Sequence, residues 1–167
     1  MKANIIIIML GIGVLVGCKT QISPTTVSYQ SKESNDHFDF GLIGQWVKDK
    51  RIVALGESTH GIGEYYALKS AIVQYLHKEL GFEILVFEGG FGDINLVWLH
   101  ADELNHIAIR DKSLFSNFRC QEVVPLFEYI KSKHKGDNPL IFAGMDPQIS
   151  GSFKIRSIVF VLFEPAN

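Results

Sequence analysis

The chain has 167 residues, a length typical of a single domain. Hydrophobic residues make up 47% and charged residues 20%, which excludes a disordered chain, and a net charge of −2 without a basic cluster argues against a nucleic-acid-binding protein. Two cysteines exclude a disulfide-rich scaffold, and no apolar run reaches the roughly 18 residues of a membrane-spanning helix.

The first seventeen residues have the pattern of a secretory signal. Lys2 supplies a positive charge, and an uncharged apolar run follows over residues 5–16. The sequence L-V-G-C, ending at Cys18, resembles a bacterial lipobox, which implies that Cys18 is acylated and becomes the first mature residue. We therefore expect residues 1–17 to be a lipoprotein signal peptide and the protein to be lipid-anchored at the periplasmic or outer face of the cell envelope. An ordinary signal peptide with an incidental cysteine is the alternative.

The chain after the signal divides into a polar tether and a folded domain. Residues 18–37 are rich in Ser, Thr, Gln and Asn and predict a tether. In chain order, hydrophobic periodicity then predicts a helix from Phe38 to about Lys50, a strand over 51–55, and a helix from Glu64 that ends at Gly81.

The second half of the domain continues the same alternation. Residues 82–87 predict a strand, and Asp93 is placed to cap a short helix through Trp98. Residues 101–118 show no clear period. A helix is predicted over 121–133 with Pro125 in its first turn, followed by a strand over 139–143. Strands that alternate with helices predict an α/β fold with a parallel sheet of βαβ units and flanking helices.

An acidic residue follows each of the three predicted strands. Glu57, Glu88 and Asp146 come after the first, second and third strand, and ligands of parallel sheets bind beyond these carboxyl ends. We therefore predict that the three carboxylates line one site. The alternative is that they only cap the helices that follow.

The segment G-E-S-T-H-G, residues 56–61, carries the strongest chemical signal. Glu57 and His60 are three residues apart in a glycine-flanked turn, so a carboxylate can orient an imidazole that acts as a general base. Ser58 does not fit a nucleophile elbow, which requires G-x-S-x-G, and no phosphate-binding loop is present. A metal site built from Glu57, His60, Glu88 and Asp146 is a second alternative, but no metal-ligand spacing supports it.

Other polar residues are expected to have structural roles. Cys120 predicts a buried thiol that packs as a small hydrophobe. Of Tyr65 and Tyr66, one is expected to pack in the core and the other to line the cleft. The remaining histidines are expected to be exposed on the surface: His37, His77, His100, His106 and His134.

Three blocks of sequence resemble the erythromycin esterase family: R-I-V-A-L-G-E-S-T-H-G-I-G-E-Y-Y-A-L-K, Y-L-H-K-E-L-G-F-E-I-L-V-F-E and G-M-D-P-Q. The resemblance covers about residues 39–148, and residues 38–148 are taken as the N-terminal part of such an α/β domain. It implies that His60 is the general base, with Glu57 and Glu88 as active-site carboxylates. It further implies substrate-binding roles for Lys69, where some members have Arg, and for Asp146.

The resemblance implies a hydrolase that acts on a small-molecule ester or lactone without a cofactor, and a link to macrolide resistance. Members of the family are longer than this chain and place further active-site histidines in the additional part. Residues 149–167 diverge into a β-prone tail, so we expect an incomplete domain, truncated or frameshifted. One alternative is a haem- or iron-binding lipoprotein of the wider superfamily, which shares a G-E-x-H turn. Another is an inactive gene fragment.

Overall fold

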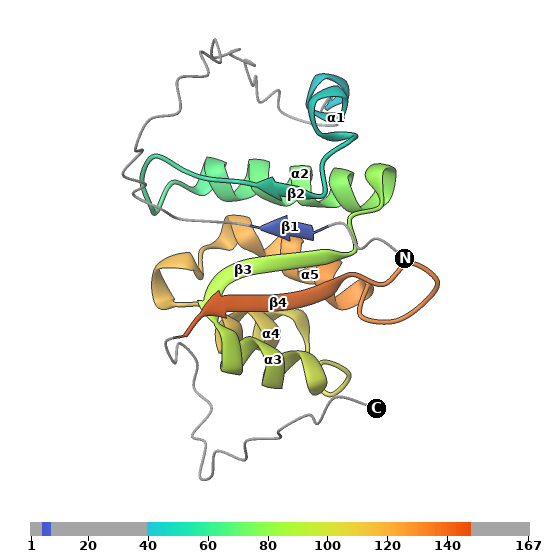
Figure 1. Ribbon diagram of the computed structural model, residues 1–167. Coiled ribbons are helices and arrows are strands. Elements are labelled where there is room, and N and C mark those ends of the chain that lie inside the picture. The colour runs from blue at the N-terminus through green and yellow to red at the C-terminus, as the bar shows by residue number, and fades with distance from the viewer. Residues whose placement is uncertain (1–4, 8–39, 148–167) are drawn as a thin grey trace.

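The computed structural model describes residues 5–7 and 40–147 (Figure 1). Helices and strands alternate along this part of the chain, as predicted. In chain order the elements are β1 (Ile5–Ile7), α1 (Gly41–Val47), β2 (Ile52–Ala54), α2 (Gly63–Leu80), β3 (Ile84–Gly90), α3 (Phe91–Leu99), α4 (His106–Ser113), the 3₁₀ turns η1 (Ser116–Phe118) and η2 (Gln121–Val123), α5 (Val124–Ser132) and β4 (Ile141–Asp146).

The strands form a parallel sheet in the order β2-β1-β3-β4. Ile5 pairs with Ile52 on one side and with Ile84 on the other, and Ile84 pairs with Ile141. All carboxyl ends therefore lie at one edge of the sheet (Figure 1). The predicted α/β class with a parallel sheet is confirmed.

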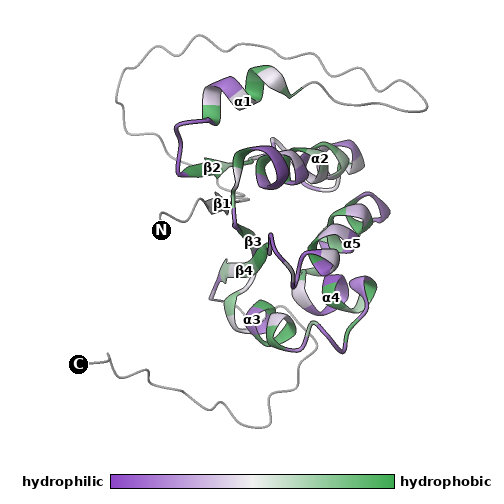
Figure 2. Cartoon of the chain, turned by 90° about the vertical axis from the view of Figure 1, so that its right-hand side faces the viewer, coloured by the Kyte–Doolittle hydropathy of each residue, from purple (hydrophilic) through white to green (hydrophobic). Residues whose placement is uncertain are grey.

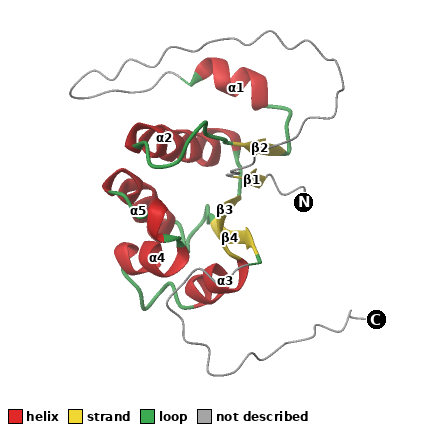
Figure 3. Ribbon diagram, turned by 90° about the vertical axis from the view of Figure 1, so that its left-hand side faces the viewer, coloured by secondary structure: helices red, strands yellow, loops and turns green. Residues whose placement is uncertain are grey.

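Most of the helical layer lies on one side of the sheet. Figures 2 and 3 show α2, α4 and α5 together on that side. Val53, Leu85 and Phe142 occupy the buried positions of their strands, and the alternate positions are less buried, with Ile52 57% and Ile141 46% exposed. Alternation along a strand thus separates a core face from a face that no described helix covers.

Helix α2 is the element on which the site is built. Its buried residues recur at helical spacing, including Tyr66, Lys69, Val73 and Leu76. Gly81 ends the helix in the left-handed conformation with φ of 66°, a backbone geometry that costs glycine little, as the sequence predicted.

The structure corrects one predicted helix cap and adds a helix that was not predicted. Asp93 does not cap α3, because the helix begins at Phe91 and Asp93 lies buried in its first turn. The segment without a clear period contains α4, whose start is capped by Asn105, since its side chain accepts a hydrogen bond from the Ala108 backbone N–H at 2.8 Å. A short helix with only two fully buried positions, Ile109 and Ser113, leaves little periodic signal.

Strand β1 comes from residues 5–7, inside the predicted signal peptide. An apolar run of β-branched residues fits both a signal peptide and a buried strand, since it can enter a membrane or occupy the centre of a sheet. The rest of residues 1–17, Cys18, most of the tether and the tail from residue 148 lie outside the described residues. Within the described part, no helix is long and apolar enough to cross a membrane.

The prediction that the histidines outside the motif are exposed is wrong for His134, whose side chain is 15% exposed, and for His77. Its side chain is fully buried, and Nδ1 lies 2.5 Å from the hydroxyl of Tyr129 on α5. Burial lowers the pKa of His77, which favours the neutral ring. This pair joins α2 to α5 and has a structural role.

Candidate active site

Glu57 is the centre of the site. It follows β2, and its side chain is only 1% exposed. Oε2 accepts a hydrogen bond from Lys69 Nζ at 2.6 Å, and Oε1 lies 2.9 Å from His60 Nδ1 and 3.4 Å from the hydroxyl of Tyr66. Helix α2 supplies Lys69 and Tyr66, three residues apart on one face, and the loop supplies His60. The structure thus joins three of the predicted site residues directly.

The charge state of Glu57 follows from these contacts. Burial by itself would raise the pKa of the carboxyl, but hydrogen bonds and charge from Lys69 and His60 overcome this effect and hold the pKa below its ordinary value. Glu57 is therefore ionised at neutral pH and can only accept hydrogen bonds.

This carboxylate selects the tautomer of the neutral His60 ring. Because Glu57 can only accept, the hydrogen between them belongs to Nδ1 of His60, and Nε2 carries the lone pair. The His60 side chain is 54% exposed, so the ring is accessible to solvent. A solvent-accessible imidazole with a fixed acceptor nitrogen is the arrangement that a general base requires.

Tyr66 completes the set of donors around Glu57. The residue is 3% exposed, and burial, together with the charge of Glu57, raises the pKa of its hydroxyl to about 12. The hydroxyl therefore keeps its proton and donates to Oε1 of Glu57. As expected, one of the two adjacent tyrosines packs in the core, and the other, Tyr65, lines a cavity.

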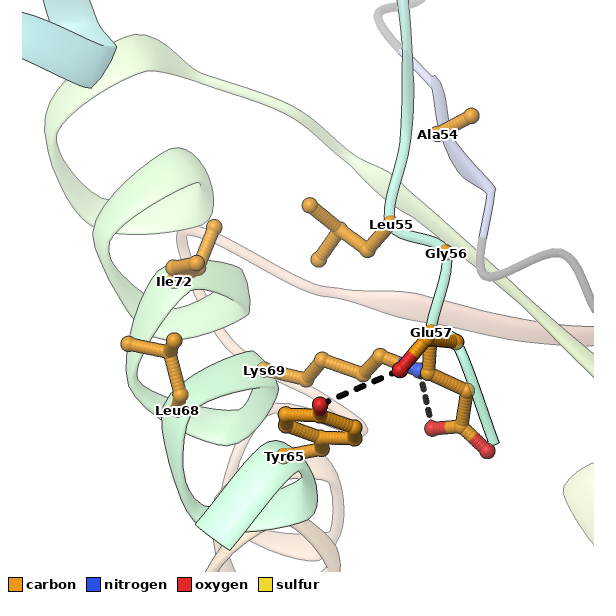
Figure 4. A pocket seen from close by; sticks show the side chains of 9 residues that line it. Ala54, Leu55, Gly56, Glu57, Tyr65, Leu68, Lys69 and Ile72 are labelled. Carbon is orange, nitrogen blue, oxygen red and sulfur yellow. Dashed lines mark hydrogen bonds and ion pairs between the residues drawn. The ribbon is translucent and has the colours of Figure 1, made fainter. Parts of the chain in front are cut away.

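The cavity has a volume of about 460 Å³ and lies between the end of β2 and α2 (Figure 4). Figure 4 shows Lys69 reaching from α2 to Glu57, with Leu55, Leu68 and Ile72 lining the apolar part. Glu57 lines this cavity, but His60 does not. The imidazole therefore contacts Glu57 from outside the cavity.

The other two predicted carboxylates lie on neighbouring strands. Glu88 is half-buried inside β3 and does not end the strand as expected, because β3 continues to Gly90. Asp146 is the last residue of β4 and is in register with Gly90. Both lie near the carboxyl edge of the sheet, and the pairing of β3 with β4 is irregular between Phe87 and Gly90, the stretch that contains Glu88.

The other candidates have weaker chemical signals. Ser58 Oγ lies 3.2 Å from the Tyr65 hydroxyl. Burial raises the pKa of the Cys120 thiol, which packs partly buried against the core and is therefore poorly suited to be a nucleophile. Among residues 5–7 and 40–147, no group of three or more His, Cys, Asp and Glu side chains is arranged to hold a metal ion.

Phe118 is a site residue that the sequence reasoning missed. Its ring lies edge-on to His60, with centroids 5.8 Å apart. It belongs to the segment without a clear period, between two helices, where spacing gives no indication of a partner more than fifty residues earlier. Asn105 is an N-cap residue in type, and this signal could have predicted where α4 begins. The position of α4 in turn defines where the loop that holds Phe118 starts.

Fold and site define an α/β protein with a carboxylate-oriented histidine at the carboxyl edge of a parallel sheet. The chain is similar to "Putative hydrolase YbfO" of Bacillus subtilis (strain 168), with 39% identity over 124 residues, which are 74% of this chain and 28% of YbfO. It is also similar to "Erythromycin esterase type II" of Escherichia coli, with 26% identity over 132 residues, 76% of this chain and 31% of that protein.

The chain therefore spans about 30% of the length of these two curated relatives. No family model matches the chain, and no solved structure matches it. The names of the two relatives agree with the hydrolytic family that the sequence motifs resemble.

Proposed function

We propose that this protein is a hydrolase that cleaves an ester or lactone bond by general-base activation of water. The hydrogen bond between Glu57 Oε1 and His60 Nδ1 carries the proposal, because it leaves Nε2 of an exposed imidazole as the proton acceptor. The names of two similar proteins, a hydrolase and an erythromycin esterase, support the same class of reaction.

The proposed reaction begins with water bound at Nε2 of His60. The nitrogen takes a proton as the water oxygen attacks the carbonyl carbon, and the carbonyl π electrons move to its oxygen. The tetrahedral intermediate then collapses, the bond to the alcohol oxygen breaks, and the protonated imidazole returns the proton to that oxygen. Glu57 stabilises the imidazolium that exists between the two proton transfers.

The remaining predicted residues have supporting roles in this proposal. Lys69 keeps Glu57 ionised, and an ammonium has three N–H donors, of which the bond to Glu57 uses one. The others can bind a substrate oxygen, which is the substrate-binding role expected for Lys69. Glu88 and Asp146 remain proposed site carboxylates, since both lie near the carboxyl edge of the sheet.

Replacement of His60 tests the proposal. We expect His60→Ala to lower kcat by about 10²–10⁴-fold, the usual contribution of a general base, with little change in KM. The measurement is hydrolysis of p-nitrophenyl acetate and of erythromycin, followed by absorbance and by mass spectrometry. His100→Ala is the control, because this exposed histidine ends α3, outside the site. Equal turnover by the two variants would remove His60 from the mechanism.

Opening of a macrolide lactone, and with it macrolide resistance, is the more specific form of the proposal. It rests on the second relative named above and on the sequence motifs. The expected product is the parent macrolide plus one water, a gain in mass that the same mass spectra detect. Turnover of the acetate ester with an unchanged erythromycin mass would restrict the proposal to simple esters.

We also propose anchoring to the cell envelope through a lipid on Cys18, which lies outside the described residues. The lipobox-like sequence before it supports this. Radiolabelled palmitate should label the expressed protein and not Cys18→Ser, while Cys120→Ser should keep the label. Labelling of the Cys18 variant would contradict the proposal.

A further inference from the structure

We infer that Phe118 is a positioning residue that holds the His60 imidazole in the orientation set by Glu57. The inference rests on the proposed function, in which this imidazole is the base. Phe118 is 2% exposed and approaches the ring edge-on, with an interplanar angle of 76°. His60 is followed by Gly61 with φ of 83° in a loop, so the backbone on that side adds little restraint.

The hydrogen bond to Glu57 and the edge of the Phe118 ring both restrain the His60 imidazole. The hydrogen bond fixes one ring atom, Nδ1, and this exposed side chain can still turn away from Glu57 by rotation about its Cα–Cβ and Cβ–Cγ bonds. An aromatic edge packed against the ring removes this freedom. The two contacts together fix both the tautomer and the direction of Nε2.

Phe118 also contacts the side chains that surround the site. Its ring lies 6.2 Å from that of Tyr66 on α2 and 5.9 Å from that of Phe87 on β3, both edge-on. Tyr66 in turn donates a hydrogen bond to Glu57. One buried ring therefore links the loop of His60, helix α2 and strand β3.

The loop that holds Phe118 is itself fixed. Arg119 donates from Nε and Nη2 to the carbonyl oxygen of Leu114, at 2.8 and 2.6 Å. The Phe118 backbone N–H donates to the carbonyl of Phe115 at 3.0 Å. Two charge-assisted hydrogen bonds from a planar guanidinium close the segment from Leu114 to Arg119 and keep the Phe118 ring in place.

The test compares Phe118→Leu with two other leucine variants in the full chain. Phe115→Leu changes the same loop at a ring 6.4 Å from Phe118, and Phe127→Leu changes a fully buried ring that packs on Phe142. The readout is the pair of ¹⁵N chemical shifts of the His60 ring, which report the tautomer without any turnover. His60→Gln identifies these signals among the six histidines.

We expect wild type and both controls to show protonated Nδ1 and unprotonated Nε2. In Phe118→Leu, the ring should leave Glu57 part of the time, so the two shifts should move toward each other, as in a ring that exchanges between tautomers. Unchanged shifts in Phe118→Leu, or an equal change in Phe127→Leu, would overturn the inference. Should Phe118→Leu fail to fold, Phe118→Met takes its place, since it keeps an apolar side chain without a ring.

Hydrolysis of p-nitrophenyl acetate provides the second readout. The loss of one edge-on aromatic contact predicts a fall in kcat of about tenfold with KM nearly unchanged. A wild-type chain without turnover would contradict the proposed function, whereas the ¹⁵N shifts would still decide the role of Phe118. An equal loss of kcat in Phe127→Leu would show that Phe118 supports only the fold.

Discussion

Lys69 Nζ lies 2.6 Å from Glu57 Oε2, and the two side chains are 8% and 1% exposed. The pair joins the loop after β2 to the second turn of α2. Removal of one member of a buried ion pair leaves the other charge without compensation, which costs far more than the net stabilisation from the intact pair. The pair is therefore a sensitive test of whether the site is built as described.

We expect Lys69→Met to destabilise the fold by about 3–5 kcal/mol, because it leaves Glu57 buried without its cation. Urea unfolding followed by circular dichroism measures the change. Lys69→Arg keeps the charge and should cost much less. The double variant Glu57→Gln with Lys69→Met should be more stable than Lys69→Met alone, and a double variant that is less stable would contradict the ion-pair interpretation.

The lowered pKa of Glu57 predicts a loss of stability in acid. A carboxyl whose folded-state pKa lies below its unfolded value adds stability above the unfolded value, and this contribution disappears as pH falls through the folded value. Stability should therefore fall below about pH 4, near the ordinary pKa of Glu. The free energies of unfolding of wild type and Glu57→Gln, measured in urea from pH 7 to 3, should therefore become more similar as the pH falls below about 4.

Asp102 provides the control for the pH experiment. A hydrogen bond from Lys135 also lowers the pKa of Asp102, but this carboxyl lies at the surface, where solvent screens the pair. Asp102→Asn should therefore follow the wild-type pH profile closely. A profile for Glu57→Gln that is parallel to that of wild type would show that Glu57 does not titrate as described.

Gly144 is required by the close approach of β3 and β4. A Cβ at this position would lie 2.7 Å from the carbonyl oxygen of Gly89 and 2.8 Å from that of Gly90. Both are backbone atoms and cannot move aside cheaply, so Gly144→Ala should destabilise the fold by about 1–3 kcal/mol. Gly92→Ala is the control, because open space surrounds that helical position, and it should be neutral or stabilising in thermal unfolding. Equal melting temperatures for Gly144→Ala and Gly92→Ala would contradict the close approach of β3 and β4 at Gly144.

The two interpretations of residues 5–7 can be separated by one pair of variants. In β1 these residues pair with β2 on one side and β3 on the other, so Ile6→Pro removes a ladder hydrogen bond at the centre of the sheet. In the chain that keeps its N-terminus, Ile6→Pro should unfold at lower urea than Ile6→Val. Mass spectrometry of the protein from bacterial membranes shows which N-terminus it has. A mature protein that begins at Cys18 would give identical stability for both variants and exclude β1 from it.

The local pattern of the sequence determined most of the elements and the central pair of the site. Apolar runs and helical spacing predicted α1, α2, α3, α5 and three of the four strands, since these patterns report burial on one face. The spacing of Glu57 and His60 predicted their contact, because residues three apart in a tight turn can meet whatever the rest of the fold does.

Only the tertiary structure decided which distant side chains complete the site. Lys69 and Phe118 reach Glu57 and His60 from elements 12 and 58 residues further along the chain, and these approaches depend on how α2 and η1 pack against the sheet. His77 is buried for the same reason, because α5 covers a helix face that looks polar in sequence. Periodicity shows that a face is buried, but the partner and the distance follow from packing between elements, which a one-dimensional pattern does not contain.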